Sequence, residues 1–252
     1  MIYDLQKASI WKRISAFLFD VILWGVLLAG VALLLSTVLG YDGYAARQEE
    51  LTASYEGEYG VSFDITAADY EKLTPEQAKH LDDAWYALHT NEEMIHLRGM
   101  QLSLTLIITT FSILISCLVM EFLIPLLFGN GQTLGKKIFG IAVMRIDGVK
   151  ISPLILFVRT VLGKFTLETM IPVFLIIMLY FQLTGIVGIG AIAILFLAQI
   201  ALVIASRTNS LLHDKLSSTV VVDFVSQMIF DTPEDLIEYK KRLHEADVAA
   251  KE

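Results

Sequence analysis

Long apolar runs constrain this chain more than any other feature. Residues 14–39 form one such run, and Asp20 is its single ionisable side chain. The hydrocarbon core of a bilayer is about 30 Å thick and needs roughly 20 apolar residues per helix, so this run can cross a membrane. It is too long for the apolar region of a secretory signal peptide, which has about 7–15 residues. Composition agrees, because 55% of all residues are hydrophobic and 18% are charged, against about 25% charged in a soluble domain.

Three further spans are expected. Residues 102–128 form the second span, which Glu121 interrupts. The apolar stretch 166–206 is too long for a single crossing and has glycines near its middle. We interpret it as a helical hairpin of spans 166–183 and 189–207; the alternative is one span and a re-entrant segment. The expected fold class is an all-α membrane protein with four transmembrane helices.

Lysine and arginine residues indicate which ends of the spans face the cytoplasm, where these residues are enriched. Three of them precede the first span, six lie in the loop 129–165, and Arg207 follows the last span. On the other side, Arg47 and Arg98 are the bases close to a span. We therefore expect both termini to be cytoplasmic and residues 41–99 to lie outside.

The segment between the first two spans is acidic and carries signals for helix starts. Residues 41–99 contain 13 acids and 4 bases. Thr66–Asp69 and Thr74–Gln77 each match the capping-box pattern, in which side chains satisfy the first backbone N–H groups of a helix. We expect a small helical extracytoplasmic insertion with two short helices.

Two further elements are expected on the cytoplasmic side. Residues 142–151 resemble a short β-hairpin with an Asp-Gly turn, and Ser152-Pro153 starts a helix whose bases can lie among lipid headgroups. The tail carries a charged C-terminal helix that ends near Ala249. The expected segments are the N-terminal segment with the first span (1–40), the acidic insertion (41–99), the second span (100–128), the basic cytoplasmic loop with its interfacial helix (129–165), the hairpin of the last two spans (166–207) and the tail (208–252).

Two acids inside the spans are the strongest functional candidates. Asp20 follows Arg13 by seven residues, nearly two helical turns, so both side chains project from one face. An unpaired Asp at the membrane centre costs about 2.5–3.5 kcal/mol, which predicts a cationic partner or water beside it. Glu121 lies at a comparable depth, and two neighbouring carboxylates could share a proton. For both acids, a proton or cation ligand and a structural ion pair are both open readings.

The remaining polar patterns favour structural roles. The run Gly131–Lys137 lacks the spacing of a nucleotide-binding loop, so its glycines are assigned to a tight exit from the second span. Its lysines are expected at the anionic inner leaflet, and they could also meet the carboxylate of Asp214 or Glu121. Glu168 follows Lys164 by four residues, where a surface pair is expected. His213-Asp214 suggests either a proton relay or a capping and ion-pair role, and we favour the second. Two outer pairs could bind zinc or arise by chance on a charged helix: His89 with Glu93, and Glu92 with His96.

Several function classes are not expected from this sequence. The spans contain no nucleophile or metal constellation, so we expect no enzymatic activity, catalytic residue, cofactor or bound metal. A basic footprint for nucleic acid is absent from a chain with a formal net charge of −8. Cys117 has no second cysteine with which to form an intrachain disulfide, and it is interpreted as a small core residue.

The sequence resembles the RDD family of bacterial membrane proteins, which is named for one arginine and two aspartates. The resemblance is carried by WKRISAFLFD at 11–20, GQTLGKKIFGIAVMRIDGVKIS at 131–152, Arg159 and LLHDKLSSTVVV at 211–222. It places the three residues of the name at Arg13, Asp20 and Asp214, and it does not include the acidic insertion or the tail helix. Ser217-Ser218 departs from the Ala-Gly that the family pattern has before Thr219.

The resemblance implies a bacterial plasma-membrane location and membrane transport, with sodium–proton antiport in some members. We expect the lipid bilayer, protons and monovalent cations as partners, together with a homo-oligomer, since four helices make a small transporter. In this hypothesis Asp20 and Glu121 line a polar cavity, and Arg13 tunes the Asp20 charge. The rival is a non-transporting scaffold or assembly protein whose charges only fix helix packing. The candidate residues are the charges Arg13, Asp20, Glu121 and Asp214 and the inner-loop motif Gly131, Gln132, Thr133, Gly135, Lys136 and Arg159.

Overall fold

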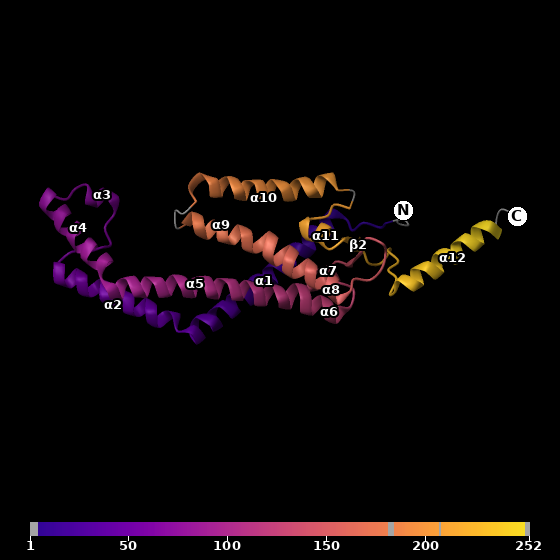
Figure 1. The fold of residues 1–252 in the computed structure, drawn as a ribbon, viewed down its shortest axis with the longest axis horizontal. Coiled ribbons are helices and arrows are strands. Elements are labelled where there is room, and N and C mark those ends of the chain that lie inside the picture. Colours follow the sequence, from indigo (N-terminus) through magenta and orange to yellow (C-terminus); the bar gives the residue numbers. More distant parts are fainter. Residues whose placement is uncertain (1–4, 181–183, 207, 250–252) are drawn as a thin grey trace. The chain divides into compact units, whose positions relative to one another are not determined.

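The computed structural model describes residues 5–180, 184–206 and 208–249 (Figure 1). Two compact units are formed: residues 1–28 together with 113–252, and residues 29–112. The expected ends of the last two spans, at Leu183 and Arg207, lie outside the described residues. Each unit is treated below by itself.

Four helical runs are long and apolar enough to cross a membrane. Few of their residues are buried in the single chain, which suits helices that face lipid. The chain is therefore predominantly helical, with four candidate membrane-spanning helices, as the sequence predicts. The runs are α1 (Ile10–Leu39), the run Glu92–Phe128 made of α5 (Glu92–Leu118), η1 (Val119–Leu123) and α6 (Ile124–Phe128), the run Pro153–Leu179 in α8 (Pro153–Phe157), η2 (Val158–Met170) and α9 (Ile171–Tyr180), and α10 (Gly185–Ala205).

The third run begins 13 residues earlier than the sequence predicts, because the expected interfacial helix is continuous with the span. The expectation of a start at Thr166 was wrong because Arg159 and Lys164 interrupt the apolar pattern. Both bases have buried carboxylate partners, Asp214 and Glu121, which allow the helix to carry them into the protein interior.

Two segments of these runs are π-helical, with the wider turn that π-helices have. Hydroxyl groups stabilise the longer one, η2, because Thr166 donates to the Val161 carbonyl and Thr169 to the Lys164 carbonyl, both at 2.8 Å and both five residues back. Segments of this kind are rare and occur frequently at functional sites. Both η1 and η2 carry ionisable residues of the candidate site.

A two-stranded antiparallel sheet pairs β1 (Ile141–Arg145) with β2 (Thr219–Asp223), with Val143 opposite Val221. The expected hairpin over 142–151 is only a minor part of this arrangement. Its turn is present, since Arg145 N–H donates to the Val149 carbonyl at 2.8 Å, but a single bridge joins its two arms. The distant strand pairs with β1 over five residues, four of which are buried, whereas the short arm has room for only one bridge.

The unit 29–112 contains the acidic insertion. Helix α4 (Pro75–Thr90) begins with a full capping box between Thr74 and Gln77, and α3 (Ala67–Tyr70) is capped by Thr66. A third helix, α2 (Tyr41–Tyr59), was not predicted. None of its residues, all of which the structure describes, is buried, so no apolar period marks it in the sequence. The other short helices are α7 (Leu134–Ile138), α11 (Leu212–Leu216) and the tail helix α12 (Pro233–Ala249).

Candidate functional site: a buried charge cluster

Asp20 caps the short helix α7. Its side chain is 8% exposed, and Oδ1 accepts a 2.8 Å hydrogen bond from the Gly135 backbone N–H. Oδ2 accepts a short hydrogen bond from the Thr133 hydroxyl, and this hydroxyl oxygen also accepts from the Lys136 backbone N–H at 3.3 Å. Both carboxylate oxygens are thus held by the first turn of α7, where backbone N–H groups favour negative charge.

The expected pairing of Arg13 with Asp20 is wrong. Arg13 Nη2 lies 3.9 Å from Asp214 Oδ2 instead, and Nη1 donates to the Thr208 carbonyl at 3.4 Å. The reason is that α7 already satisfies Asp20, which leaves the guanidinium for a second carboxylate. The three residues that give the resembled family its name therefore belong to two linked sites, not to one triad.

Arg159 and Asp214 form a closed, buried ion pair. Each is 1% exposed, and Asp214 Oδ1 accepts from Arg159 Nε at 3.1 Å and Nη2 at 2.7 Å. Burial by itself would raise the pKa of Asp214, but Arg159, His213 and Arg13 outweigh it and hold that pKa well below its usual range. The expectation that Arg159 lies among lipid headgroups is therefore wrong. Asp214, on α11, thus contacts Arg13 on α1 and Arg159 on η2. Removing either partner of a buried ion pair is destabilising, so these charges hold the three elements together.

Glu121 lies between two lysines. Lys164 Nζ is 2.5 Å from Glu121 Oε1, and Lys136 Nζ is 3.6 Å from Oε2. The Thr160 hydroxyl donates to the Glu121 backbone carbonyl at 2.9 Å, which ties η2 to the π-helical turn η1. Within the described part of the chain, no hydrogen bond or ion pair joins Glu121 to Asp20, so the two acids do not share a proton directly.

Lys136 is buried beside Glu121, so of the two positions expected for the loop lysines it takes the one next to a carboxylate and not the lipid surface. Its Nζ and Glu121 Oε2 are buried atoms that make no hydrogen bond with any described residue. Burial lowers the pKa of Lys136 to about 8, with Lys164 and Arg159 adding to this effect and Glu121 and Asp20 opposing it. Lys136 can therefore release a proton near physiological pH, unlike an ordinary lysine.

Glu168 and His213 form a pair that the sequence did not predict. His213 Nδ1 lies 2.7 Å from Glu168 Oε2, and the His213 backbone N–H donates to Oε1 at 2.9 Å. The expected surface pair of Glu168 with Lys164 is not formed, because Lys164 contacts Glu121 instead. The partners are 45 residues apart, so no local spacing relates them.

The inner-loop motif has a structural role beneath the cluster. Gly131 has φ +60°, and a Cβ there would come within 3.0 Å of Val143 Cβ. Gln132 donates to the Ile141 carbonyl at 2.8 Å, fixing the loop to β1. The expectation of a tight exit from the second span is met by these contacts, while Lys137, whose Nζ lies 3.8 Å from the centre of the Phe128 ring, contacts the end of that span.

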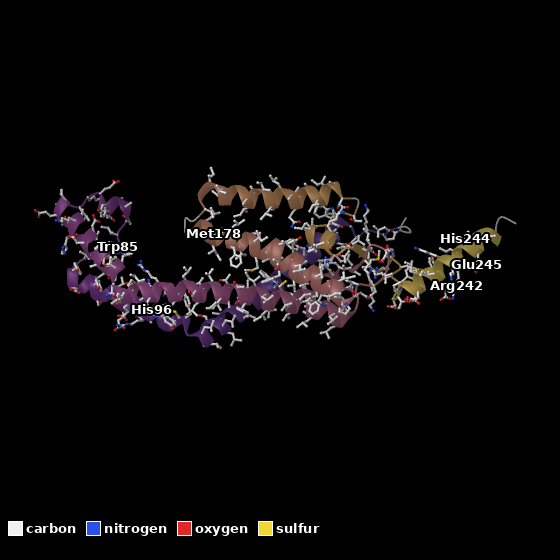
Figure 2. All side chains as sticks on the ribbon, in the orientation of Figure 1. Trp85, His96, Met178, Arg242, His244 and Glu245 are labelled. Atoms are coloured by element: carbon white, nitrogen blue, oxygen red, sulfur yellow. The ribbon has the colours of Figure 1, made fainter. Side chains whose placement is uncertain are left out.

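One of the two outer pairs considered for zinc, His89 with Glu93, makes other contacts. Glu93 accepts from Arg47 Nε at 2.7 Å, and His89 stacks on Trp85 with ring centroids 4.4 Å apart. Trp85 lies on α4 and His96 on α5 (Figure 2). Among the described residues, no group of three or more His, Cys, Asp and Glu side chains is placed to hold a metal.

Together these residues form a balanced charge cluster within the unit that contains α7, β1 and β2. It has four carboxylates and four basic side chains: Asp20, Glu121, Glu168 and Asp214, with Arg13, Lys136, Arg159 and Lys164. Four apolar helices that carry such a cluster define a multi-span α-helical membrane protein. The cost of burying these groups is offset because each lies beside an opposite charge or, for Asp20, accepts hydrogen bonds from α7.

The chain belongs to the RDD family, which matches residues 7–218. The match extends from the residues just before α1 to the residue before β2, and it includes every member of the charge cluster. Comparison with curated proteins and with solved structures finds no match.

Proposed function

We propose that this protein exchanges a monovalent cation for a proton across the bacterial plasma membrane, with both termini in the cytoplasm. Glu121 is the cation-binding carboxylate, and Lys136 is the group that releases the proton. The observation that carries the proposal is the pair of buried atoms Glu121 Oε2 and Lys136 Nζ, which lie 3.6 Å apart without a hydrogen bond. Such a contact leaves both groups able to accept another partner.

The exchange balances in charge and protons. With Lys136 protonated, its ammonium group neutralises Glu121. When a cation binds Glu121, Lys136 loses its proton, and the neutral amine remains beside the bound ion. One cation enters as one proton leaves, so the site keeps the same charge in both states. This matters because a buried net charge is expensive.

Asp20, the carboxylate favoured from the sequence, is less suited to this role. Its oxygens accept from Thr133 and Gly135, so a cation would have to compete with the cap of α7. Glu121 also lies on a π-helical turn, and its partner Lys164 lies on another. Rare π-helical turns on both sides of one contact favour a functional site over a packing contact.

A non-transporting scaffold is the second candidate, and the closed Arg159–Asp214 pair favours it. A buried pair in which Asp214 Oδ1 accepts two hydrogen bonds from Arg159, with both residues 1% exposed, fixes helix positions and leaves little room for a substrate. In a scaffold, Glu121 and the lysines would do the same. The two functions differ in whether ions cross the membrane.

Proteoliposomes decide between them. Purified protein is reconstituted with a pH-sensitive dye inside, and a sodium, potassium or lithium gradient is applied. Wild-type protein is expected to move protons against one of these cations, Glu121→Gln to abolish this flux, and Asp20→Asn to retain it. Asp20→Asn is the matched control, since it also removes one carboxylate from a span. Absence of cation-driven proton movement in the wild type would refute the proposal.

Thermal unfolding shows whether a variant that lacks flux is still folded. Glu121→Gln should unfold at a temperature within a few degrees of the wild type if its defect lies in transport. Glu121→Asp, which keeps the charge on a shorter side chain, should recover part of the flux. Loss of flux in Glu121→Gln that is accompanied by loss of the folded state would leave Glu121→Asp as the deciding variant.

A further inference from the structure

His213 lies between two carboxylates from different elements. Its Nδ1 is 2.7 Å from Glu168 Oε2 on η2, and its Nε2 is 3.5 Å from Asp214 Oδ1 on α11. The imidazole is 3% exposed. Its position is fixed from behind by Gly163, where an added Cβ would come 2.5 Å from His213 Cβ. The ring therefore cannot turn away from either acid without moving a helix.

A neutral imidazole can satisfy only one of these acids. It has one N–H donor and one bare nitrogen, whereas the imidazolium has two donors. The 2.7 Å contact with Glu168 requires the donor at Nδ1, so the neutral ring directs the lone pair of Nε2 at the Asp214 carboxylate. Adding a proton turns that repulsive contact into an attractive one.

We propose that His213 and Glu168 form a second proton-binding site, whose occupancy is coupled to cation binding at Glu121. The coupling rests on the exchange function proposed above and adds a second proton site to it. Proton binding at His213 does not depend on that function. The proton binds at His213 Nε2, and Glu168 holds the ring through Nδ1.

The charged and polar groups around His213 give the sign of the coupling. From η2 these are Glu168, Arg159 and Lys164; from α11, Asp214; and from α10, Gln199, whose Oε1 accepts from the Leu212 N–H at 3.2 Å. Burial lowers the pKa of His213 below its usual value of 6.5, with Arg159 and Lys164 lowering it further and Asp214 and Glu168 opposing them.

Lys164 links this site to the cation site. Its ammonium group is neutralised by Glu121 at 2.5 Å, and it acts on His213 through its charge. A cation bound at Glu121 competes with Lys164 for that carboxylate. The net charge of the cation site stays the same, because Lys136 loses its proton, but the Lys164 charge that acts on His213 is less compensated. His213 then binds its proton less tightly, so cation binding and proton release occur together.

Nuclear magnetic resonance of ring-labelled histidine in nanodiscs tests this directly. The chain has five histidines, and His213→Asn identifies the resonance of interest. In the wild type this resonance is expected to titrate, with a midpoint that falls in sodium chloride relative to an equal concentration of N-methylglucamine chloride. The expected fall is smaller than the roughly one pH unit that an uncompensated unit charge would give at roughly 10 Å and an effective dielectric constant of about 20, because the net charge of the cation site does not change.

Two variants separate the coupling from the site. Glu121→Gln should leave His213 titrating but remove the sodium effect, whereas Glu168→Gln should lower the midpoint without sodium. Asparagine at 213 keeps a donor toward Glu168 but cannot bind a proton, so His213→Asn should retain the thermal unfolding temperature and flatten the pH profile of flux.

The outcomes distinguish this inference from the proposed function. A His213 ring that stays neutral down to about pH 5, below the range in which histidines ordinarily titrate, overturns the proton site. If the midpoint of the His213 titration is the same with and without sodium, in protein that exchanges cations for protons, the coupling is overturned. If wild-type liposomes show no cation-driven proton movement, the exchange function fails, and the titration of His213 still decides the proton site.

Discussion

Asp20 and Glu121 show how the same functional group acquires different chemistry from its neighbours. Both are carboxylates in otherwise apolar helices, and the sequence alone ranks Asp20 first. The N-terminus of α7 then takes both oxygens of Asp20, while two lysines contact Glu121 and one of them makes no hydrogen bond. A carboxylate whose two oxygens both accept hydrogen bonds from the protein serves packing, whereas one with an oxygen left without a hydrogen bond can take a new partner. Depth in the membrane matters less for this difference.

Gly135 is required by the close approach of α1 to α7. An added Cβ would overlap the Ala16 carbonyl oxygen and lie 2.9 Å from Asp20 Cγ, so Gly135→Ala must displace a backbone. Overpacking of this kind costs about 1–3 kcal/mol, and we expect a lower unfolding temperature. Gly25→Ala is the matched control on α1, because nothing lies within 4 Å of its added Cβ. Equal unfolding temperatures for the two variants would contradict the packing described.

Ser218 has a backbone conformation that suits glycine, the residue that the family pattern has there. Its φ is +51°, in the left-handed region that costs an L-residue roughly 1–2 kcal/mol. Ser218→Gly should therefore raise stability by up to about 1 kcal/mol, once the extra chain entropy of glycine is subtracted. Ser217→Gly, at φ −96°, should lower it, because the Ser217 hydroxyl donates to the His213 carbonyl at 2.7 Å. Thermal unfolding of the two variants in detergent gives the comparison, and the opposite order would refute it.

At the scale of elements, local patterns predicted what local forces determine. The capping box at Thr74 depends on four consecutive residues, and the four apolar runs depend on windows of about 20. The strand partner of β1 does not depend on a short window of sequence. β2 lies more than 70 residues away and competes with the nearer segment 149–151 for pairing with β1. The start of the third span was missed for the same reason, since the burial of Arg159 depends on Asp214, 55 residues later.

The pairing of β1 with β2 can be tested by cross-linking. Val143 and Val221 are directly opposite in the register, and opposite residues have Cα atoms about 4.5–5.5 Å apart, within the range of a disulfide. In a Cys117→Ser background, Val143→Cys with Val221→Cys should cross-link on mild oxidation. Val143→Cys with Thr219→Cys is the control, because Thr219 is displaced by two residues, about 6.6 Å along the strand. Cross-linking of the control alone would mean that the register is wrong.

For the whole molecule, the sequence predicted the membrane architecture better than the site. The hydropathy of a segment is the sum over its residues, so the spans can be identified from the sequence without knowing how the helices pack. The charge cluster brings together residues from α1, η1, α7, η2 and α11, and Asp20 and Gly135 are 115 residues apart. The family resemblance identified Arg13, Asp20 and Asp214, but it did not indicate which of the charged residues form ion pairs with one another. The pairing of Glu168 with His213 was missed because the two residues are 45 positions apart in the sequence.

The pH dependence of exchange follows from Lys136. Its pKa is lowered to about 8, chiefly by burial, so below that pH the protonated amine holds Glu121 and a cation must displace its proton. For one-to-one competition, KM for the cation should rise about tenfold for each pH unit below 8 and level off above it, while kcat changes less. Lys136→Gln cannot bind the proton, so its KM should lose the tenfold rise per pH unit below 8 and its cation flux should move fewer protons; any pH dependence that remains would come from His213. Flux assays from pH 6 to 9 give both profiles, with thermal unfolding as the check on folding. A wild-type KM that is already constant between pH 6 and 8 would show that Lys136 does not exchange its proton for the cation.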